Sequence, residues 1–383
     1  MRILIFNTNY YPNIIGGAEI STQLLAETLS TLDNQVWVCT IAESEKRDVI
    51  NGVNIVYTNY RNFYWGFRGT KQKWKKFCWH ALDIFNPFFI KFISELIDEI
   101  KPDVVHTNNI CGFSCCIWNI AKRKGIPIVH TIRDYYLICY KSTMYRKGKI
   151  CGRQCLDCKL SSIVSKYLSQ KIDAVVGISQ FVLDKHLSLG YFRDSKKKKV
   201  IFNSVEIDPI LGNRESHVIG FIGSIYPNKG LERLISDFCR IHRNDYYLEI
   251  AGTGDADYMN NLKCRCSQHN IRFLGRVNVV EFLSHISLLV VPSEWNEPFG
   301  RVVVEALSCE CPVFVSNRGG MPELVPPSSG RVFTLEDRDS LYSLLSEFVN
   351  NQLSFSFNNI AKCFRSKIVA QSYLNLYNSL LKL

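Results

Sequence analysis

Short apolar runs alternate with amphipathic segments of helical period along the whole chain. In the first half, apolar runs that favour buried strands stand at residues 2–6, 36–40, 53–57, 104–106, 126–131, 174–178 and 200–202, and helical patterns fit at residues 17–32, 80–100, 112–124 and 179–189. The strand series begins again at residues 218–223 and continues at 248–251, 271–274, 288–291, 313–315 and 330–333. Strands that alternate with helices are typical of parallel α/β sheets, so the pattern predicts two α/β domains.

A polar segment at residues 203–214 separates the two series. We therefore expect a first domain at residues 1–205, a second at residues 215–365, and a helix at residues 366–383 that packs back toward the first domain. Open parallel sheets bind ligands at the carboxyl ends of their strands. Two such domains that face each other would form a cleft lined by loops from both sides.

The composition is that of a folded, water-soluble protein. The chain has 383 residues, of which 46% are hydrophobic and 21% charged. No apolar run approaches the roughly 18 residues of a membrane span, and residues 1–6 lack the longer apolar core of a signal peptide. These features predict a cytoplasmic protein. Its 15 cysteines would then stay reduced, and most would be small buried residues.

The excess of positive over negative charge is confined to the first half of the chain. Residues 1–210 carry 29 Lys and Arg against 18 Asp and Glu, whereas residues 211–383 carry 17 of each. The basic residues cluster at 61–76, 141–159 and 196–199. These clusters are either solvated loops or, where aromatic residues accompany them, a surface for anionic membrane. Because no zinc-finger, RNP or helix-turn-helix motif is present, we expect membrane binding and no nucleic acid partner.

Two carboxylates, Glu297 and Glu305, flank a predicted strand-to-helix junction with Gly300 between them. A helix N-terminus has free N–H groups that suit a phosphate, and a glycine there leaves room for a ligand. Carboxylates accept hydrogen bonds from hydroxyls. The arrangement indicates a ligand with both phosphate and sugar hydroxyls, such as a nucleotide sugar. The alternative is that both are ordinary surface acids.

The stretch E-P-F-G-x-x-x-x-E-A, which follows Pro292-Ser293, resembles the signature of the retaining glycosyltransferases of family 4. The resemblance covers nearly the whole chain and is most specific at residues 220–326. It implies an α/β protein of the GT-B fold, with two facing Rossmann-like domains and an interdomain cleft. It also implies transfer of a sugar from a nucleotide sugar to an acceptor hydroxyl, with no cofactor required for catalysis.

The same resemblance implies roles for individual residues. Glu297 would hold sugar hydroxyls near the reacting carbon, Glu305 would hold the ribose, and Lys229 would stabilise the diphosphate. The other donor-binding candidates, several of them through backbone groups, are Gly16, Gly17, Ser224, Gly254, Arg276, Phe299, Gly300, Arg301 and Val302. The family usually has an arginine where this chain has Ser224, so the phosphate affinity depends on Arg301 or another base.

Arg133 and Asp134 follow a predicted strand of the first domain. In much of the family a histidine stands where this chain has Arg133, and that histidine faces the reacting sugar. His130, three residues earlier, would point to the opposite face of the strand, so we expect it to be buried and structural. Arg133 could orient the donor phosphate or an acidic acceptor, and Asp134 could orient the acceptor hydroxyl.

Four cysteines, Cys139, Cys151, Cys155 and Cys158, fall inside a basic segment that is twenty residues long. Four thiolates at this spacing could hold a structural zinc ion, and a disulfide or free thiols are the alternatives.

The sequence therefore predicts a retaining hexosyltransferase that uses a UDP- or GDP-linked sugar and acts on a lipid-linked or surface-polysaccharide glycan. We expect it in the cytoplasm, peripheral on the inner face of the membrane. The alternatives are a GT-B nucleotide-sugar epimerase, a phosphorylase-like enzyme, and a degenerate, non-catalytic protein that binds polyanions. Ser224 and Arg133 favour the last of these.

Overall fold

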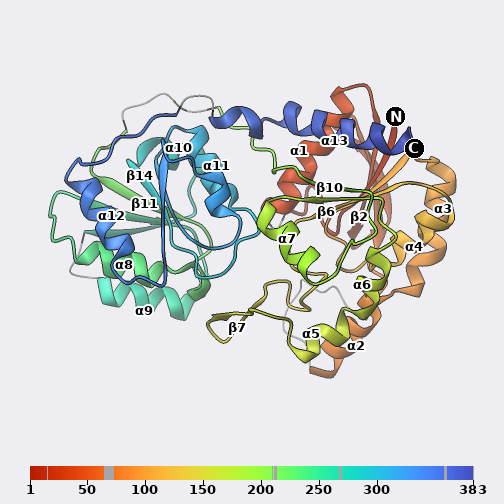
Figure 1. Ribbon diagram of the computed structural model, residues 1–383, viewed down its shortest axis with the longest axis horizontal. Helices are drawn as coiled ribbons and strands as arrows, with labels where there is room; N and C mark the ends of the chain where they lie inside the picture. Colours follow the sequence, from red (N-terminus) through yellow and green to blue (C-terminus); the bar gives the residue numbers. More distant parts are fainter. Residues whose placement is uncertain are drawn as a thin grey trace. The chain divides into compact units, whose positions relative to one another are not determined.

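The computed structural model describes the chain except residues 15, 64–72, 209, 211–213, 267–269, 358–359 and 383. The described chain divides into two compact units (Figure 1). Unit 1 comprises Met1–Met144, Cys151–Ser204 and Arg365–Leu383, and unit 2 comprises Tyr145–Ile150 and Val205–Phe364. Each unit is built on a parallel sheet, as the alternating pattern predicts. Within the described residues, no helix has both the length and the apolar character needed to cross a membrane.

Unit 1 contains an eight-stranded sheet in the order β10-β9-β6-β5-β1-β2-β4-β3. Its strands are β1 (Arg2–Phe6), β2 (Gln35–Ala42), β3 (Lys46–Ile50), β4 (Val53–Asn59), β5 (Val104–Thr107), β6 (Ile128–Ile132), β9 (Ala174–Gly177) and β10 (Lys197–Val200). Only β3 pairs antiparallel within this sheet. The winding reverses between β1 and β5, and open α/β sheets bind ligands at the carboxyl ends of the strands at such a point.

The helices of unit 1 are α1 (Gly17–Thr31), α2 (Lys73–Ile84), α3 (Ile90–Ile100), α4 (Cys116–Arg123), α5 (Leu156–Ser161), α6 (Ile163–Ser169), α7 (Gln180–Ser188) and α13 (Ser366–Leu381). The first and last of these, α1 and α13, pack side by side and share one apolar core with the sheet. Two buried tyrosines of α13 also bind the strands. The hydroxyl of Tyr377 lies 2.7 Å from Nδ1 of His106, and the hydroxyl of Tyr373 lies 3.0 Å from Oγ1 of Thr131. The C-terminal helix is thus an integral part of unit 1.

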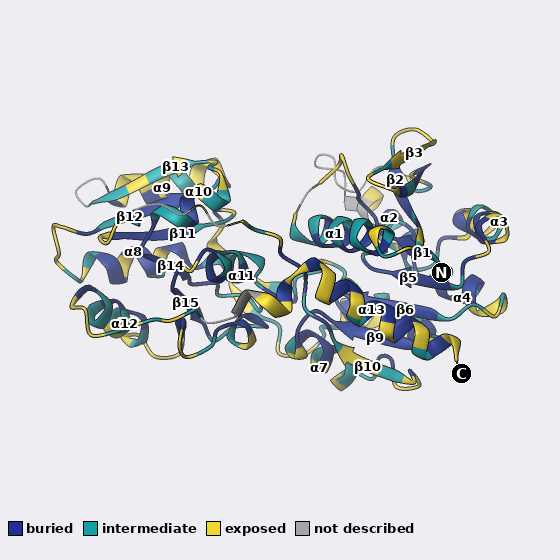
Figure 2. Cartoon of the chain, turned by 90° about the horizontal axis from the view of Figure 1, so that it is seen from above, coloured by how far each residue is buried: buried dark blue, intermediate teal, exposed yellow. Residues whose placement is uncertain are grey.

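Unit 2 contains a six-stranded parallel sheet in the order β13-β12-β11-β14-β15-β16. Its strands are β11 (Val218–Ile222), β12 (Tyr247–Ala251), β13 (Ile271–Gly275), β14 (Leu288–Val291), β15 (Val313–Ser316) and β16 (Gly330–Phe333). Its helices are α8 (Leu231–Cys239), α9 (Ala256–Cys266), α10 (Val279–His285), α11 (Arg301–Ser308) and α12 (Ser340–Val349). The central strands are buried, while the helices carry exposed side chains (Figure 2).

A short hairpin of β7 (Tyr145–Arg146) and β8 (Lys149–Ile150) corrects the predicted domain division. The sequence places these residues in the first domain, but they cluster with unit 2. The hydroxyl of Tyr145 lies 3.5 Å from Oε2 of Glu294. This contact joins residues 149 positions apart in the chain, and no local pattern reveals it.

Two further differences have local causes. The helix predicted at residues 80–100 is interrupted, because Asn86 caps the 3-10 turn Pro87–Phe89 by accepting the N–H of Phe88 at 3.1 Å. The strand predicted at residues 200–202 lies instead at Lys197–Val200, within the lysine run. This is the edge of the sheet, where lysine side chains stay hydrated and discourage pairing with other chains.

We expect Tyr377→Phe to lower the free energy of unfolding by about 1–3 kcal/mol, because the fully buried His106 loses a hydrogen-bond partner. Tyr10→Phe is the matched control, since the Tyr10 hydroxyl is buried without a partner among the described residues. Its removal should be neutral or stabilising. Urea denaturation measures both variants, and an equal loss in the two would contradict the role given to Tyr377.

Candidate functional site

The winding of the unit 2 sheet reverses between β11 and β14, so the loops after these strands lie beside each other. Gly230 permits their close approach. A Cβ at Gly230 would lie 1.9 Å from the carbonyl oxygen of Pro292, whereas Gly275, with the same φ of +70°, would meet nothing within 4 Å. The N–H of Glu294 also donates to the carbonyl of Asn228 at 2.9 Å. Position 230 therefore requires glycine for the contact and not only for its backbone angle.

Glu297 and Lys229 meet where these two loops touch. Oε1 of Glu297 accepts hydrogen bonds from Nζ of Lys229 at 2.5 Å, Oγ of Ser293 at 2.8 Å and Nε1 of Trp295 at 2.9 Å. The Lys229 ammonium also lies 5.5 Å from the centre of the Trp295 ring. Oε2 of Glu297 makes no hydrogen bond to the described residues. The carboxylate is thus fixed through one oxygen, and its other oxygen can accept a hydrogen bond from a ligand.

The N-terminus of α11 follows directly. Gly300 caps it with φ +100°, and a Cβ there would lie 2.7 Å from Cγ of Met321. The N–H groups of Arg301 and Val302 belong to the first turn, which has no carbonyl partners within the helix. Oε1 of Glu305, one turn later, accepts from Nε of Arg301 at 2.7 Å. Glu297 and Glu305 therefore lie on either side of the first turn of α11.

Four other predicted donor residues have structural explanations or open surroundings. The Phe299 side chain is buried and packs edge-to-face on Phe364, so only its backbone faces the loop. A Cβ at Gly254 would lie 1.8 Å from the carbonyl oxygen of Ile225, which makes this glycine necessary for loop packing. Ser224 and Arg276 are exposed.

A cavity of about 400 Å³ lies near this loop in unit 2. It is lined by Gly148, Lys149, Ile150, Arg233, Glu294, Arg318 and Leu335. Burial raises the pKa of Glu294. The guanidinium groups of Arg233 and Arg318 pair with Asp237 at 2.6 Å and with Glu336 at 2.7 Å. The cavity has the size of a small-molecule pocket, and sequence reasoning missed it because the β7–β8 hairpin supplies one wall.

The switch point of unit 1 holds Arg133. Its Nε donates to Oδ1 of Asn108 at 2.8 Å, and its NH1 donates to the amide oxygen of Asn203. Only 8% of the surface of Arg133 is exposed. Arg133 is therefore fixed by amide groups at the carboxyl end of the sheet.

Asp134 lies beside Arg133 in the chain. Oδ1 of Asp134 accepts the N–H of Tyr136 at 2.8 Å, and Nδ2 of Asn109 lies 3.4 Å from Oδ2. Burial, with a smaller contribution from the negative charge of Glu19, raises the pKa of Asp134 to about 6. Glu19 itself accepts the N–H of Gly16 at 2.8 Å and caps α1. The predicted Gly16-Gly17 turn therefore opens a helix whose first turn already carries one carboxylate.

His130 is buried and structural, as its place on the strand predicts. Its Nδ1 lies 2.9 Å from Oγ1 of Thr107, and its ring packs against Trp118 and Phe192. Burial lowers the pKa of His130 to about 3. The imidazole is therefore neutral at physiological pH.

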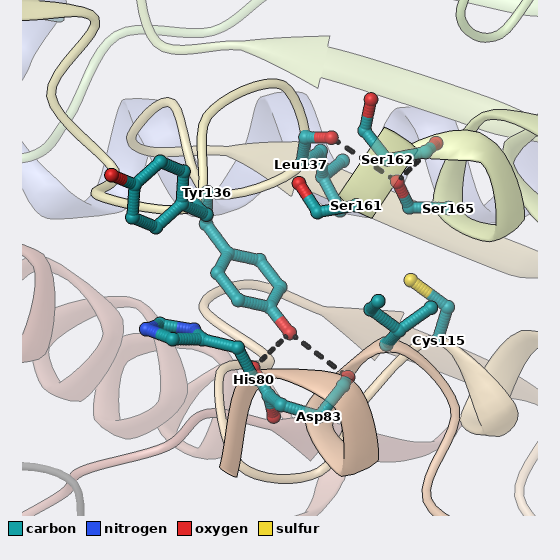
Figure 3. A pocket seen from close by; sticks show the side chains of 10 residues that line it. His80, Asp83, Cys115, Tyr136, Leu137, Ser161, Ser162 and Ser165 are labelled. Carbon is teal, nitrogen blue, oxygen red and sulfur yellow. Dashed lines mark hydrogen bonds between the residues drawn. The ribbon is translucent and has the colours of Figure 1, made fainter. Parts of the chain in front are cut away.

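A small pocket of about 40 Å³ in unit 1 surrounds Asp83 at the end of α2 (Figure 3). The hydroxyl of Tyr136 donates to Oδ2 of Asp83 at 2.6 Å, and the N–H of Gly112 donates to Oδ1 at 2.6 Å. Burial raises the pKa of Asp83 to about 7. The pocket has room for about one water molecule and not for a sugar ring.

Within the described chain, none of the 15 cysteines is joined in a disulfide. The thiol of Cys158 forms hydrogen bonds with those of Cys155 and Cys139, and burial raises its pKa to about 12. Over the part of the chain that the structure describes, no three His, Cys, Asp or Glu side chains are placed to hold a metal ion. The zinc site at Cys139, Cys151, Cys155 and Cys158 gains no support from this arrangement and stays a prediction.

Comparisons with known proteins agree over the whole chain. The family model described as Glycosyltransferase Family 4 matches residues 15–209, and the model described as Glycosyl transferases group 1 matches residues 205–362. An uncharacterized 42.6 kDa protein in the cps region of Klebsiella pneumoniae is 37% identical over 349 residues, which cover 89% of this chain and 92% of that protein.

Two solved structures share the fold. HepE of Anabaena, solved in complex with UDP, superposes with a TM-score of 0.74 at 18% identity over 99% of this chain and all of that one. The apo form of the lipopolysaccharide outer core galactosyltransferase WaaB superposes with a TM-score of 0.68 at 16% identity over the full length of both chains.

The buried Asp83 predicts a pH dependence of stability. Its pKa is higher in the folded chain than in the unfolded one, so between pH about 4 and about 7 the folded state holds a proton that the unfolded state has lost. The contribution of Asp83 to the free energy of unfolding is therefore greatest at low pH and falls as the pH rises to about 7. Asp83→Asn, which mimics the protonated acid, should be more stable than the wild type by roughly 2–4 kcal/mol at pH about 8, with a small difference at pH about 4.

Urea denaturation of both proteins at the two pH values measures this effect. The exposed Asp184→Asn on α7 controls for the loss of an acid at a solvated site. A pH-independent difference between wild type and Asp83→Asn would contradict the raised pKa.

Proposed function

The chain belongs to glycosyltransferase family 4 and has the GT-B fold, and from this premise we propose that it transfers a hexose from a nucleotide sugar to an acceptor hydroxyl with retention of anomeric configuration. The observation that carries the proposal is the state of Glu297. Lys229, Ser293 and Trp295 donate hydrogen bonds to one of its oxygens. Its second oxygen makes no hydrogen bond to the described residues. A hydrolase would need two carboxylates that flank one glycosidic bond, which is not the role proposed for this pair.

We assign the diphosphate of the donor to Lys229 and the N-terminus of α11. A phosphate there would accept the N–H groups of Arg301 and Val302 and would benefit from the helix dipole. Lys229 would neutralise the charge that develops on the leaving nucleoside diphosphate. Because Ser224 carries no charge and Arg301 already binds Glu305 through Nε, the exposed Arg276 is the further cation that we include in the donor site.

The two glutamates would then bind opposite ends of the donor. Oε2 of Glu297 would accept a hydroxyl of the transferred sugar, and Glu305 would accept the ribose hydroxyls. Among the described residues each is held through one oxygen, so its other oxygen could accept a hydroxyl without breaking a hydrogen bond. Positions fixed in advance in this way favour the transition state without reorganisation.

We place the acceptor at the carboxyl end of the unit 1 sheet, where Asp134 would orient its hydroxyl and Arg133 would hold a neighbouring acidic group. The relative in the cps region and the lipopolysaccharide galactosyltransferase WaaB favour a surface-polysaccharide or lipid-linked glycan as acceptor. HepE, which was solved with UDP, favours a UDP-linked donor over a GDP-linked one. On this proposal the protein works peripherally at the inner face of the membrane.

Glu297→Gln should lower kcat/KM by about 10²–10³-fold, since the amide cannot keep the charge that pairs with Lys229 and accepts the sugar hydroxyl. The measurement is release of UDP or GDP from common nucleotide sugars, with and without glycan acceptors, and NMR assignment of the product anomer. Glu310→Gln, in the exposed turn that follows α11, is the matched control and should keep wild-type activity.

Three results would contradict this proposal. They are unchanged transfer by Glu297→Gln, an inverted anomer, and an epimerised nucleotide sugar without transfer.

If Asp134 acts as a carboxylate on the acceptor hydroxyl, kcat/KM should fall as the pH drops through about 6, the pKa that burial gives this group. The carboxylate is present above this pH and lost below it. Asp134→Asn should lower the rate about 10²-fold or more and remove this limb of the profile. The same decline in the Asn variant would assign it to another group.

A further inference from the structure

Helices α5 and α6 of unit 1 have their apolar side chains on the outside. Leu156 and Tyr167 are each 70% exposed, and Leu160 and Ile163 are each 60% exposed. These four residues follow one another at intervals of four, three and four, which places them along one side of the two consecutive helices. We call them the α5–α6 stripe.

The opposite side of these helices is buried and carries three serines beside Cys158 and Leu168. Ser162, Ser165 and Ser169 are buried, and the hydroxyl of Ser165 donates to the carbonyl of Leu137 at 3.1 Å. Figure 3 shows Ser162 and Ser165 on the inner side, next to Leu137. A helix at the surface of a water-soluble protein usually has the reverse arrangement. Because the inner hydroxyls have backbone partners, the fold does not need the outer apolar residues for its core.

Basic residues surround the stripe. Lys159 and Lys166 are exposed on the same two helices. Residues 151–171 contain four Lys or Arg and one Asp, a net charge of +3. The neighbouring α2 packs against α5 and exposes Trp74 and Lys75, with Nζ of Lys75 5.4 Å from the Trp74 ring.

We propose that the α5–α6 stripe, with Trp74 and the surrounding lysines, docks on an anionic lipid surface. Leucine, isoleucine and the aromatic rings would enter the boundary between headgroups and acyl chains, and the lysines would extend to the phosphates. A protein partner is disfavoured by the same lysines, since lysine is depleted from protein interfaces. The proposal does not rest on the sugar-transfer activity.

This surface shares only Trp74 and Lys75 with the aromatic segment that the sequence predicts to bind membrane. The prediction concerns residues 61–76, of which 64–72 lie outside the described residues. The α5–α6 stripe is invisible to a search for basic aromatic segments, because Tyr167 is its only aromatic residue.

The test is co-sedimentation of the full chain with vesicles of phosphatidylcholine containing about one third phosphatidylglycerol. Leu160→Ser/Ile163→Ser should lower the partition coefficient at least about tenfold, since both side chains would lose their burial in lipid. Val332→Ser/Ile368→Ser removes two apolar residues that are 42% and 47% exposed elsewhere, and should bind like the wild type. Circular dichroism checks that all variants are folded.

A second pair of variants separates charge from apolar contact. Lys159→Gln/Lys166→Gln should weaken binding about fivefold per lysine on anionic vesicles and have no effect on pure phosphatidylcholine. Equal binding of the wild type and Leu160→Ser/Ile163→Ser would overturn the proposal. So would a wild-type dimer in sedimentation velocity that this variant converts to a monomer, since a second copy would then cover the stripe. Release of nucleoside diphosphate from a soluble donor should be unchanged in all these variants.

Discussion

The contact between Lys229 and Glu297 joins the two loops on which the proposed donor site depends. Each loop ends a central strand of the unit 2 sheet, on either side of the point where the winding reverses. Gly230 allows the loops to touch, and the ion pair, only 22% and 13% exposed, is less screened by water than a surface pair. On our proposal, the charge that binds a diphosphate and the acceptor for a sugar hydroxyl are thereby fixed to one sheet, so that both ends of a donor would be held with little ordering of the chain.

The sequence predicts the buried strands well, because strands covered on both faces read as continuous apolar runs. Residues 2–6, 288–291 and 330–333 are strands with the predicted bounds. The missed or displaced elements are at edges or outside the main sheets. Strand β3 and the β7–β8 hairpin are short and polar, and β10 consists mostly of lysines. Their formation depends on pairing partners that the local pattern does not contain.

For the candidate site, motif resemblance located the glutamates and Lys229 but not what holds them. Ser293 and Trp295 belong to the same loop, and only coordinates show that both donate to Oε1 of Glu297. Resemblance also assigned ligand roles to Phe299 and Gly254, whose side-chain environments are explained by packing. A motif reports that a residue type is required at a position. It does not distinguish a requirement for binding from one for packing.

The basic residues of the first half lie on two different kinds of surface. Residues 1–210 have a net charge of +11, from 29 basic and 18 acidic residues. The lysines of β10 lie on a sheet edge, where their hydration is sufficient reason for them. Those of α5 and α6 border exposed apolar side chains, where hydration alone gives no reason for the leucines and isoleucine between them. On our proposals, the neutral second half binds the soluble donor, and the first half keeps the acceptor site at the lipid surface where a lipid-linked glycan is concentrated.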